Sequence, residues 1–255
     1  MYGPWEKGLT LGHDSCLELL RVQAETCFVL SKSGRILFEN EPIPAAGPRL
    51  YVAACGEGFL AFVRDDVPGD VVDELLSFLR RQPPSSAVEA AVAGTLAGYL
   101  STQTHVTSIE TSIVYALPKD GLSLSGPAFI CSGTEEGSML LDRLDRDGFP
   151  PHLRESGFAT MEDFWPPWCV AFEGKEIATT AFAARLAPHG AEVGIVTFPA
   201  YRGRGLGAAV TAKWASLPQL ADRTLFYSTS ISNTASRRVA EKLGLERIGT
   251  GLRIT

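Results

Sequence analysis

The sequence lacks several features that would assign a protein to a class at once. It has no run of 18 apolar residues, so no segment is expected to cross a membrane. Its five cysteines contain no C-x-x-C pair, and its four histidines share no ligand-like spacing with them, so a metal site is not expected. A net charge of −6 argues against nucleic-acid binding by general electrostatic attraction.

The N-terminal segment also lacks the apolar core of a signal peptide. Met1–Thr10 carries Glu6 and Lys7 among few apolar residues. We therefore expect a cytoplasmic protein that does not bind membranes and whose cysteines are unpaired thiols. A homodimer is one option for its oligomeric state.

The excess of negative over positive charge lies entirely in the first half of the 255 residues. Residues 1–125 carry 9 basic and 15 acidic side chains, and residues 126–255 carry 14 of each. A polar stretch rich in Pro, Gly and Ser at 117–126 is the candidate boundary between a domain over 1–122 and one over 123–255. In the first, a helix within 14–30, a hairpin over 50–64 and helices over 71–81 and 87–100 predict a mixed α/β domain of unknown role.

The second half alternates strand and helix patterns more clearly. Strands are expected over 127–131, 169–173, 176–185, 192–198, 224–229 and 247–254. Helices are expected over 135–145, 154–164, 205–217 and 234–243, the last ending at Gly244. The fold class is therefore α/β of the mixed, α+β kind, with a mostly antiparallel sheet flanked by helices.

One segment carries recognisable chemistry, namely residues 196–209 (VTFPAYRGRGLGAA) between a strand and a helix. Gly203, Gly205 and Gly207 remove Cβ atoms where the helix begins, so that backbone N–H groups can point at one anion. Arg202 and Arg204 add guanidinium groups that suit phosphate. The pattern predicts a pyrophosphate cradle, and the plain alternative is a flexible surface turn.

Other phosphate loops fit the segment less well. No Lys-Ser/Thr follows the glycines, as a P-loop requires. Gly203-x-Gly205-x-x-Ala208 matches a loose dinucleotide fingerprint, but four residues from Pro199 to Arg202 separate it from the strand. The next strand also ends in Ser and Thr, without an acid for a ribose.

The segment Arg202-x-x-Gly205-x-Gly207, preceded by a strand and Pro199, resembles the acetyl-CoA signature of the GNAT N-acetyltransferase superfamily. A second stretch, from Ser228 through Asn233 to Leu245, resembles the family's strand, Asn, helix and K-L-G-[FL] motif. The resemblance covers about residues 125–255. An additional N-terminal domain is similar to the arrangement of the glycine N-acyltransferase-like branch.

The resemblance implies acetyl-CoA as cosubstrate and assigns residues to it. The strand before the loop would pair with the pantetheine arm, the loop amides and arginines would hold the pyrophosphate, and Asn233 and Ser236 would reach the cofactor. For Asn233 a helix N-cap is an alternative or additional role. The implied cofactor-binding residues are Ile195, Val196, Thr197, Arg202, Arg204, Gly205, Leu206, Gly207, Ala208, Asn233 and Ser236.

The same resemblance implies a base that deprotonates the amine and an acid that protonates the departing thiolate. Glu192 matches the position of a catalytic glutamate in many family members, although a strand-end ion pair would also explain it. Ala240 stands where many relatives have a tyrosine acid, so Tyr227 is the substitute candidate, with Ser228 and Ser230 behind it.

The leading interpretation is an N-acetyltransferase that moves an acetyl group from acetyl-CoA directly to a primary amine of a small molecule or a protein. No metal is implied, because aminolysis of a thioester needs orientation and proton transfer. The alternative is a non-catalytic CoA-binding module with a sensory or interaction role. A third interpretation makes the acidic first half an interaction domain that delivers a partner's amine.

Overall fold

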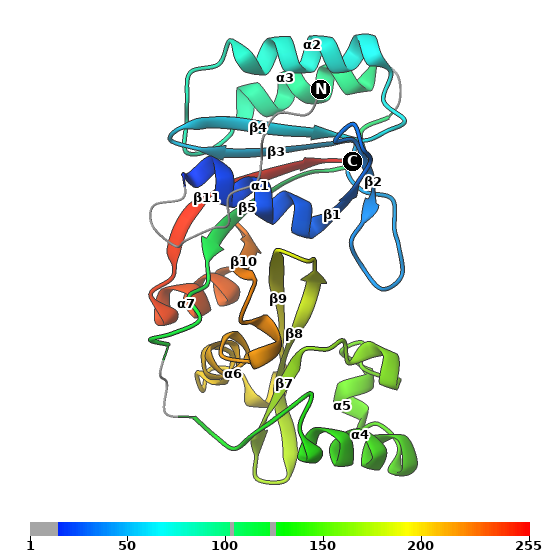
Figure 1. Ribbon diagram of the computed structural model, residues 1–255, viewed down its shortest axis with the longest axis vertical. Helices are drawn as coiled ribbons and strands as arrows, with labels where there is room; N and C mark the ends of the chain where they lie inside the picture. The colour runs from blue at the N-terminus through cyan, green and yellow to red at the C-terminus, as the bar shows by residue number, and fades with distance from the viewer. Residues whose placement is uncertain (1–14, 103–104, 123–125) are drawn as a thin grey trace.

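The computed structural model describes residues 15–102, 105–122 and 126–255 (Figure 1). The segment on which the signal-peptide expectation rests, Met1–Thr10, lies outside the described residues. None of the helices in the described ranges has the length and apolar character needed to span a bilayer.

A nine-stranded sheet forms the centre of the molecule, with the strand order β4-β3-β11-β5-β10-β9-β8-β7-β6. Of its neighbouring pairs, β9 and β10 run parallel and the others run antiparallel. The strands are β3 (Leu50–Cys55), β4 (Gly58–Val63), β5 (Ile109–Ala116), β6 (Phe129–Cys131), β7 (Trp168–Glu173), β8 (Glu176–Leu186), β9 (Gly190–Thr197), β10 (Thr224–Ser230) and β11 (Glu246–Ile254). Two further strands, β1 (Phe28–Leu30) and β2 (Ile36–Glu39), form a separate antiparallel pair.

Helices cover both faces of the sheet. One face carries α1 (Cys16–Cys27), α4 (Glu135–Asp147) and α5 (Pro151–Arg154), and the other carries α2 (Gly69–Arg80), α3 (Ala90–Ser101), α6 (Leu206–Ala215) and α7 (Thr234–Leu243). Three short 3-10 turns lie at Met161–Asp163, Pro199–Tyr201 and Pro218–Leu220. The predicted mixed α/β class with a mostly antiparallel, helix-flanked sheet is confirmed.

Small side chains bring α6 close to the sheet. Ala181 and Ala183 on β8 are fully buried against Val210 and Trp214 of α6. Because these alanines let the two backbones approach closely, α6 packs directly on β8, and Gly207 in its first turn lies next to Ile195 and Thr197 of β9. This packing fixes where the glycine-rich loop before α6 lies.

The sheet is continuous across the candidate boundary at residue 122. Strand β5, from the first half, pairs with β11 on one side and with β10 on the other. The last strand, β11, in turn pairs with β3. The division into 1–122 and 123–255 stays a prediction, but the two segments share one sheet.

The expected helix over 154–164 is wrong. The chain there forms only the single turn α5 and the 3-10 turn at Met161–Asp163. Gly157 adopts φ +90°, which breaks the helical path, and the Asp163 carboxylate accepts from the amides of Ala159 at 2.8 Å and Thr160 at 2.7 Å. A local side-chain cap thus replaces the helical bonds.

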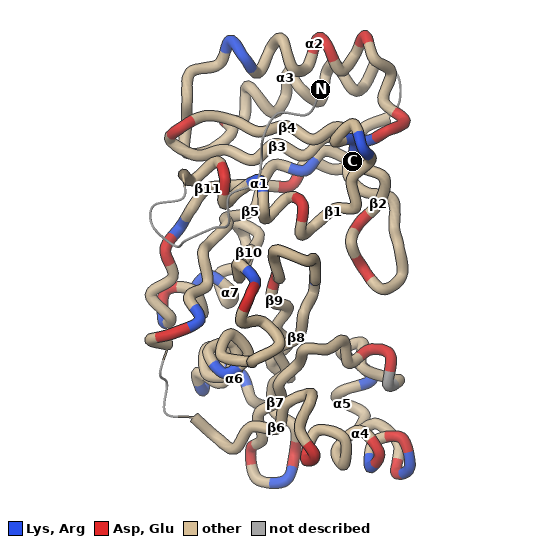
Figure 2. Tube along the Cα trace, viewed as in Figure 1, with Lys and Arg blue, Asp and Glu red and all other residues tan. Residues whose placement is uncertain are grey.

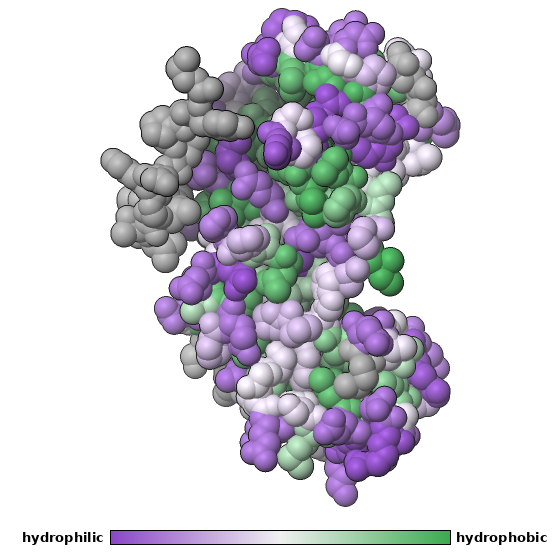
Figure 3. All heavy atoms as spheres, turned by 45° about the vertical axis from the view of Figure 1, so that its right-hand side comes forward, coloured by the Kyte–Doolittle hydropathy of each residue, from purple (hydrophilic) through white to green (hydrophobic). Residues whose placement is uncertain are grey.

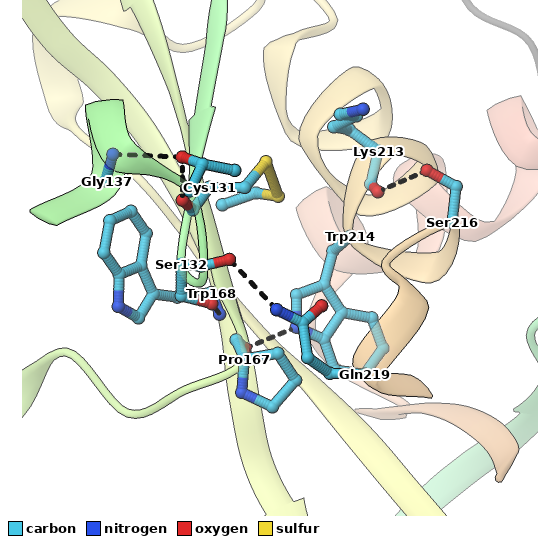
Figure 4. Close-up of a disulfide and its surroundings, with 11 residues drawn as sticks. Cys131, Ser132, Gly137, Pro167, Trp168, Lys213, Trp214, Ser216 and Gln219 are labelled. Carbon is cyan, nitrogen blue, oxygen red and sulfur yellow. Dashed lines mark hydrogen bonds between the residues drawn. A yellow bond between two sulfur atoms is a disulfide. The ribbon is translucent and has the colours of Figure 1, made fainter. Parts of the chain in front are cut away.

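The expectation that all cysteines are unpaired is also wrong. Cys131 on β6 and Cys169 on β7 are register partners 4.2 Å apart at Cα, and their sulfurs form a disulfide (Figure 4). Both residues are buried, at 5% and 0% exposure. Their sequence separation of 38 gives no spacing signal, because strand pairing alone brings the two thiols together. The bond ties the short edge strand β6 to the sheet, beside the Trp214–Pro167 and Gln219–Ser132 hydrogen bonds.

Charged residues of both signs are interspersed along the chain, including on α4 (Figure 2). In the space-filling view the molecule is narrower midway along its long axis, and its hydrophobic residues lie in separate patches between hydrophilic ones (Figure 3).

Candidate active site

The candidate site lies where β9 and β10 separate. These strands pair only over three residues, Gly190–Glu192 with Thr224–Phe226. Beyond that point β9 follows β8 to Thr197, while β10 follows β5 to Ser230. The divergence leaves the edge of residues 193–197 open toward β10, as an added extended ligand would require.

A cavity of about 700 Å³ occupies this divergence. Its volume falls in the range of small-molecule sites, roughly 300–1,000 Å³. The cavity is lined by Ile195, Val196, Thr197, Tyr201, Arg202, Gly203, Gly205, Leu206, Gly207, Ala208, Tyr227, Asn233, Ala235, Ser236, Arg238, Val239 and Lys242. The structure therefore brings together ten of the eleven predicted cofactor-binding residues, together with Tyr227.

The loop before α6 needs glycine at two positions. Gly203 and Gly205 both adopt φ +79°, a left-handed conformation that side chains disfavour. A Cβ at Gly205 would also collide with the ammonium group of Lys242. The bend is therefore open to a ligand because its residues lack side chains.

The first amides of α6 lie at the cavity wall. Gly205 precedes the helix, and Ala209 donates the first helical bond, to the Gly205 carbonyl at 3.3 Å. The amides of Leu206, Gly207 and Ala208 thus belong to the open first turn, where the helix dipole favours an anion. All three residues line the cavity.

The two loop arginines have different roles. Arg202 lines the cavity, and its Nε donates to the Thr197 carbonyl at 3.1 Å. Arg204 is directed elsewhere: its guanidinium forms an ion pair with Glu173 and donates to the Ala200 carbonyl at 3.0 Å. The structure therefore does not bring the Arg204 side chain to the cavity. The ion pair of Arg204 instead links the loop to Glu173 at the end of β7.

Two cations of α7 were missed by the sequence reasoning. Arg238 and Lys242 line the cavity one helical turn apart, and Lys242 lies beside Gly205. Their spacing of four residues on the helix after Asn233 was a usable signal. Basic residues occur on both helices that border the cavity, α6 and α7 (Figure 2).

Asn233, Ser236 and Tyr227 form a connected polar wall. Asn233 caps α7, because its Oδ1 accepts from the Ser236 amide at 3.0 Å, and it lines the cavity as well. The Tyr227 hydroxyl lies 2.6 Å from Ser236 Oγ and donates to the Ser236 carbonyl at 3.0 Å. Burial raises the pKa of Tyr227, and its hydrogen bond with Ser236 opposes this in part. A tyrosine in this state stays protonated at neutral pH and can donate a proton.

Glu192 lies on the opposite face of the sheet and does not line the cavity. It occupies the last paired position before the strands diverge, next to Phe226 of β10. Its Oε1 accepts from Ser228 Oγ at 2.8 Å, and its Oε2 accepts from Gln23 Nε2 at 2.8 Å. The two candidate proton-transfer residues, Glu192 and Tyr227, thus flank the divergence from opposite faces.

Residues 155–250 match the family model described as GNAT acetyltransferase. This segment is thus similar to the GNAT acetyltransferases, and the match supports an acyltransferase.

The chain is similar to several solved structures over most of its length, at low sequence identity. A GCN5-related N-acetyltransferase from Kribbella flavida is 15% identical over 94% of each chain, with a TM-score of 0.44. A GCN5-related N-acetyltransferase-like protein from Streptococcus suis is 15% identical over 94% of this chain and 100% of its own, with a TM-score of 0.43. An acetyltransferase from the GNAT family of Colwellia psychrerythraea is 14% identical over 80% of each chain, with a TM-score of 0.41. Scores below 0.5 establish neither activity nor substrate, and no curated protein matches the chain.

The GNAT segment contains every residue of the cavity, as well as Glu192 and Tyr227. It does not contain β5, which completes the sheet beside β10, or α1, whose Gln23 bonds Glu192. Ala240, at the position of the usual tyrosine acid, is 1% exposed in the core.

A second cavity of about 320 Å³ lies farther along α6, between Lys119, Phe129 and Lys213.

Proposed function

We propose that this GNAT acyltransferase transfers an acetyl group from acetyl-CoA directly to a primary amine. The observation that carries the proposal is the cavity in the β9–β10 divergence, which combines an open strand edge, a helix N-terminus and cationic side chains. An extended amide-containing arm suits the open strand edge, and a pyrophosphate suits the helix N-terminus and the cationic side chains.

The donor would be held mostly by the backbone. Residues 195–197 of β9 present an open edge with which the pantetheine amides would pair. The amides of residues 205–208 would bind the pyrophosphate, with Arg202, Arg238 and Lys242 supplying charge. Asn233 and Ser236 would contact the same arm from α7.

Glu192 would accept the proton of the amine. A lysine-like amine has a pKa of about 10.4 and is mostly protonated at neutral pH, so its lone pair must be freed before it attacks. The nitrogen then bonds to the thioester carbonyl carbon, the carbon–sulfur bond breaks, and the nitrogen, left with a positive charge, releases its second proton to solvent. Tyr227, whose raised pKa keeps it protonated, would donate a proton to the departing thiolate from the other face.

The acceptor would reach the divergence from the face that carries Glu192, α1 and α5. A primary amine of a small molecule or of a protein fits this chemistry equally. The experiment is release of free CoA thiol from acetyl-CoA over a panel of amines. Turnover with at least one amine is expected, and Glu192→Gln should reduce kcat by roughly 10²–10⁴.

A non-catalytic CoA-binding module is the second candidate, because Ala240 removes the usual acid of the family. Binding of CoA without turnover on any amine would favour it. A Glu192→Gln variant as active as the parent would instead retain the enzyme and dismiss Glu192 as its base.

A further inference from the structure

A chain of buried polar groups runs from the first half of the sequence to Glu192. The Tyr51 hydroxyl on β3 donates to Gln23 Oε1 at 2.8 Å, and Gln23 Nε2 donates to Glu192 Oε2 at 2.8 Å. Gln23 and Tyr51 are each 3% exposed. Tyr51 belongs to a buried cluster that also contains Leu20 and Phe28. An unpaired buried amide is destabilising, so these bonds hold Gln23 in one orientation.

The carboxylate of Glu192 is held at both oxygens. Ser228 donates to Oε1 from β10, and Gln23 donates to Oε2 from α1. The Cys27 thiol lies 3.6 Å from Oε2 and accepts from Gln23 Nε2 at 3.1 Å. Burial, followed by the charge of Glu192, raises the pKa of Cys27 well above its ordinary value, so the thiol stays neutral.

The cations near Glu192 are neutralised by other carboxylates. Arg185 is its register partner on β8, but its guanidinium pairs with Glu39 at 3.3 Å and with Glu41 at 2.5 Å. Arg253 on β11 also pairs with Glu39. The hydrogen bonds of Glu192 therefore come from neutral groups, namely the amide of Gln23, the hydroxyl of Ser228 and the thiol of Cys27. Burial also raises the pKa of Tyr51, so its phenol stays neutral.

We propose that Gln23 is a positioning residue that orients Glu192 as the base, so that helix α1 completes the active site of the GNAT segment. The inference rests on the proposed function. Under this inference, the first 122 residues contribute to the reaction by positioning the base, in addition to any binding of a partner. Without α1, the carboxylate keeps only the bond from Ser228 and can rotate away from the divergence.

The test is the pH profile of kcat/KM for Gln23→Glu in the full chain. The substitution keeps the shape of the side chain but places a second carboxylate beside Glu192. Two adjacent carboxylates cannot both ionise readily and share one proton, so the acid limb should move upward by about 1–3 pH units. The KM for acetyl-CoA should stay unchanged, since Gln23 does not line the cavity.

Gln82→Glu is the matched control. Gln82 donates to the Phe78 carbonyl at the end of α2, so the same chemical change there should leave the profile as it is in the parent. If Gln23→Glu does not fold, Tyr51→Phe replaces it as the test variant, because it deletes only the hydroxyl that donates to Gln23. It should lower kcat several-fold and leave the KM for acetyl-CoA unchanged.

If the parent is active and Gln23→Glu leaves its pH profile unchanged, the role of Gln23 is overturned while the proposed function stands. An unchanged kcat in Tyr51→Phe, where that variant is used instead, has the same consequence. A parent that binds CoA but acetylates no amine overturns the proposed function and this inference with it.

Discussion

Substitution of Gly205 by alanine tests the cradle directly. The left-handed backbone at φ +79° costs an alanine roughly 1–2 kcal/mol, and the new methyl group displaces the Lys242 ammonium from the loop. Lys242 is exposed, so loss of its contact with a phosphate costs about 0.2–1 kcal/mol, which corresponds to a donor bound up to about fivefold more weakly. The KM for acetyl-CoA should rise by this factor while kcat changes little, because the substitution leaves Glu192 and Tyr227 in place.

Gly174→Ala is the matched control for this prediction. Gly174 also adopts a left-handed conformation, at φ +62°, but a Cβ there meets no atom within 4 Å. Both variants should lose about 1–2 kcal/mol of unfolding free energy in urea titrations, and only Gly205→Ala should weaken the donor. Steady-state kinetics with S-acetyl-pantetheine, which lacks the pyrophosphate, should show no difference between them. Equal KM values for acetyl-CoA in the two variants would refute the assignment of the pyrophosphate to this loop.

Three further predictions address the other parts of the site and fold. Tyr227→Phe should lower kcat by roughly 10²-fold or more at constant KM, and a variant with the parent's kcat would remove Tyr227 as the acid. Lys242→Gln, at an exposed position, should raise the KM for acetyl-CoA about fivefold and leave that for S-acetyl-pantetheine unchanged, which salt-dependent kinetics can check. Reductant should lower the unfolding free energy of the parent by about 2–4 kcal/mol, and a Cys131→Ser, Cys169→Ser double variant that still responds to reductant would contradict a stabilising disulfide.

Local patterns in the sequence predicted most of the cavity. The glycines before α6, the cap at Asn233 and the left-handed end of α7 at Gly244 each depend on a few consecutive residues. Such features are set by backbone geometry, which residue type restricts directly. The predicted elements around them, such as the β7–β8 hairpin, are confirmed with small shifts of their ends.

Contacts between distant segments were not predictable in the same way. Strand β5 has a mostly half-exposed pattern and polar residues, so nothing local marks it as the strand between β10 and β11. The bond from Gln23 to Glu192 joins residues 169 apart. Both depend on how the chain closes its sheet, which is decided by packing over the whole molecule.

Side-chain direction limited the remaining assignments. Arg204 belongs to the loop by sequence, yet the acid at Glu173 draws its guanidinium away from the cavity. Lys242 lies 37 residues downstream of Gly205, but α7 places its ammonium beside that glycine. Which cation serves a backbone cradle is therefore a question of tertiary packing.

Amide hydrogen exchange in the presence and absence of CoA tests the central claim most directly. If the β9–β10 divergence holds the donor, CoA should slow exchange at residues 195–197 and 203–208, and residues 119–122 and 209–216 along the second cavity should be unaffected. Unchanged exchange at 203–208 with saturating CoA, or protection confined to the second cavity, would contradict it.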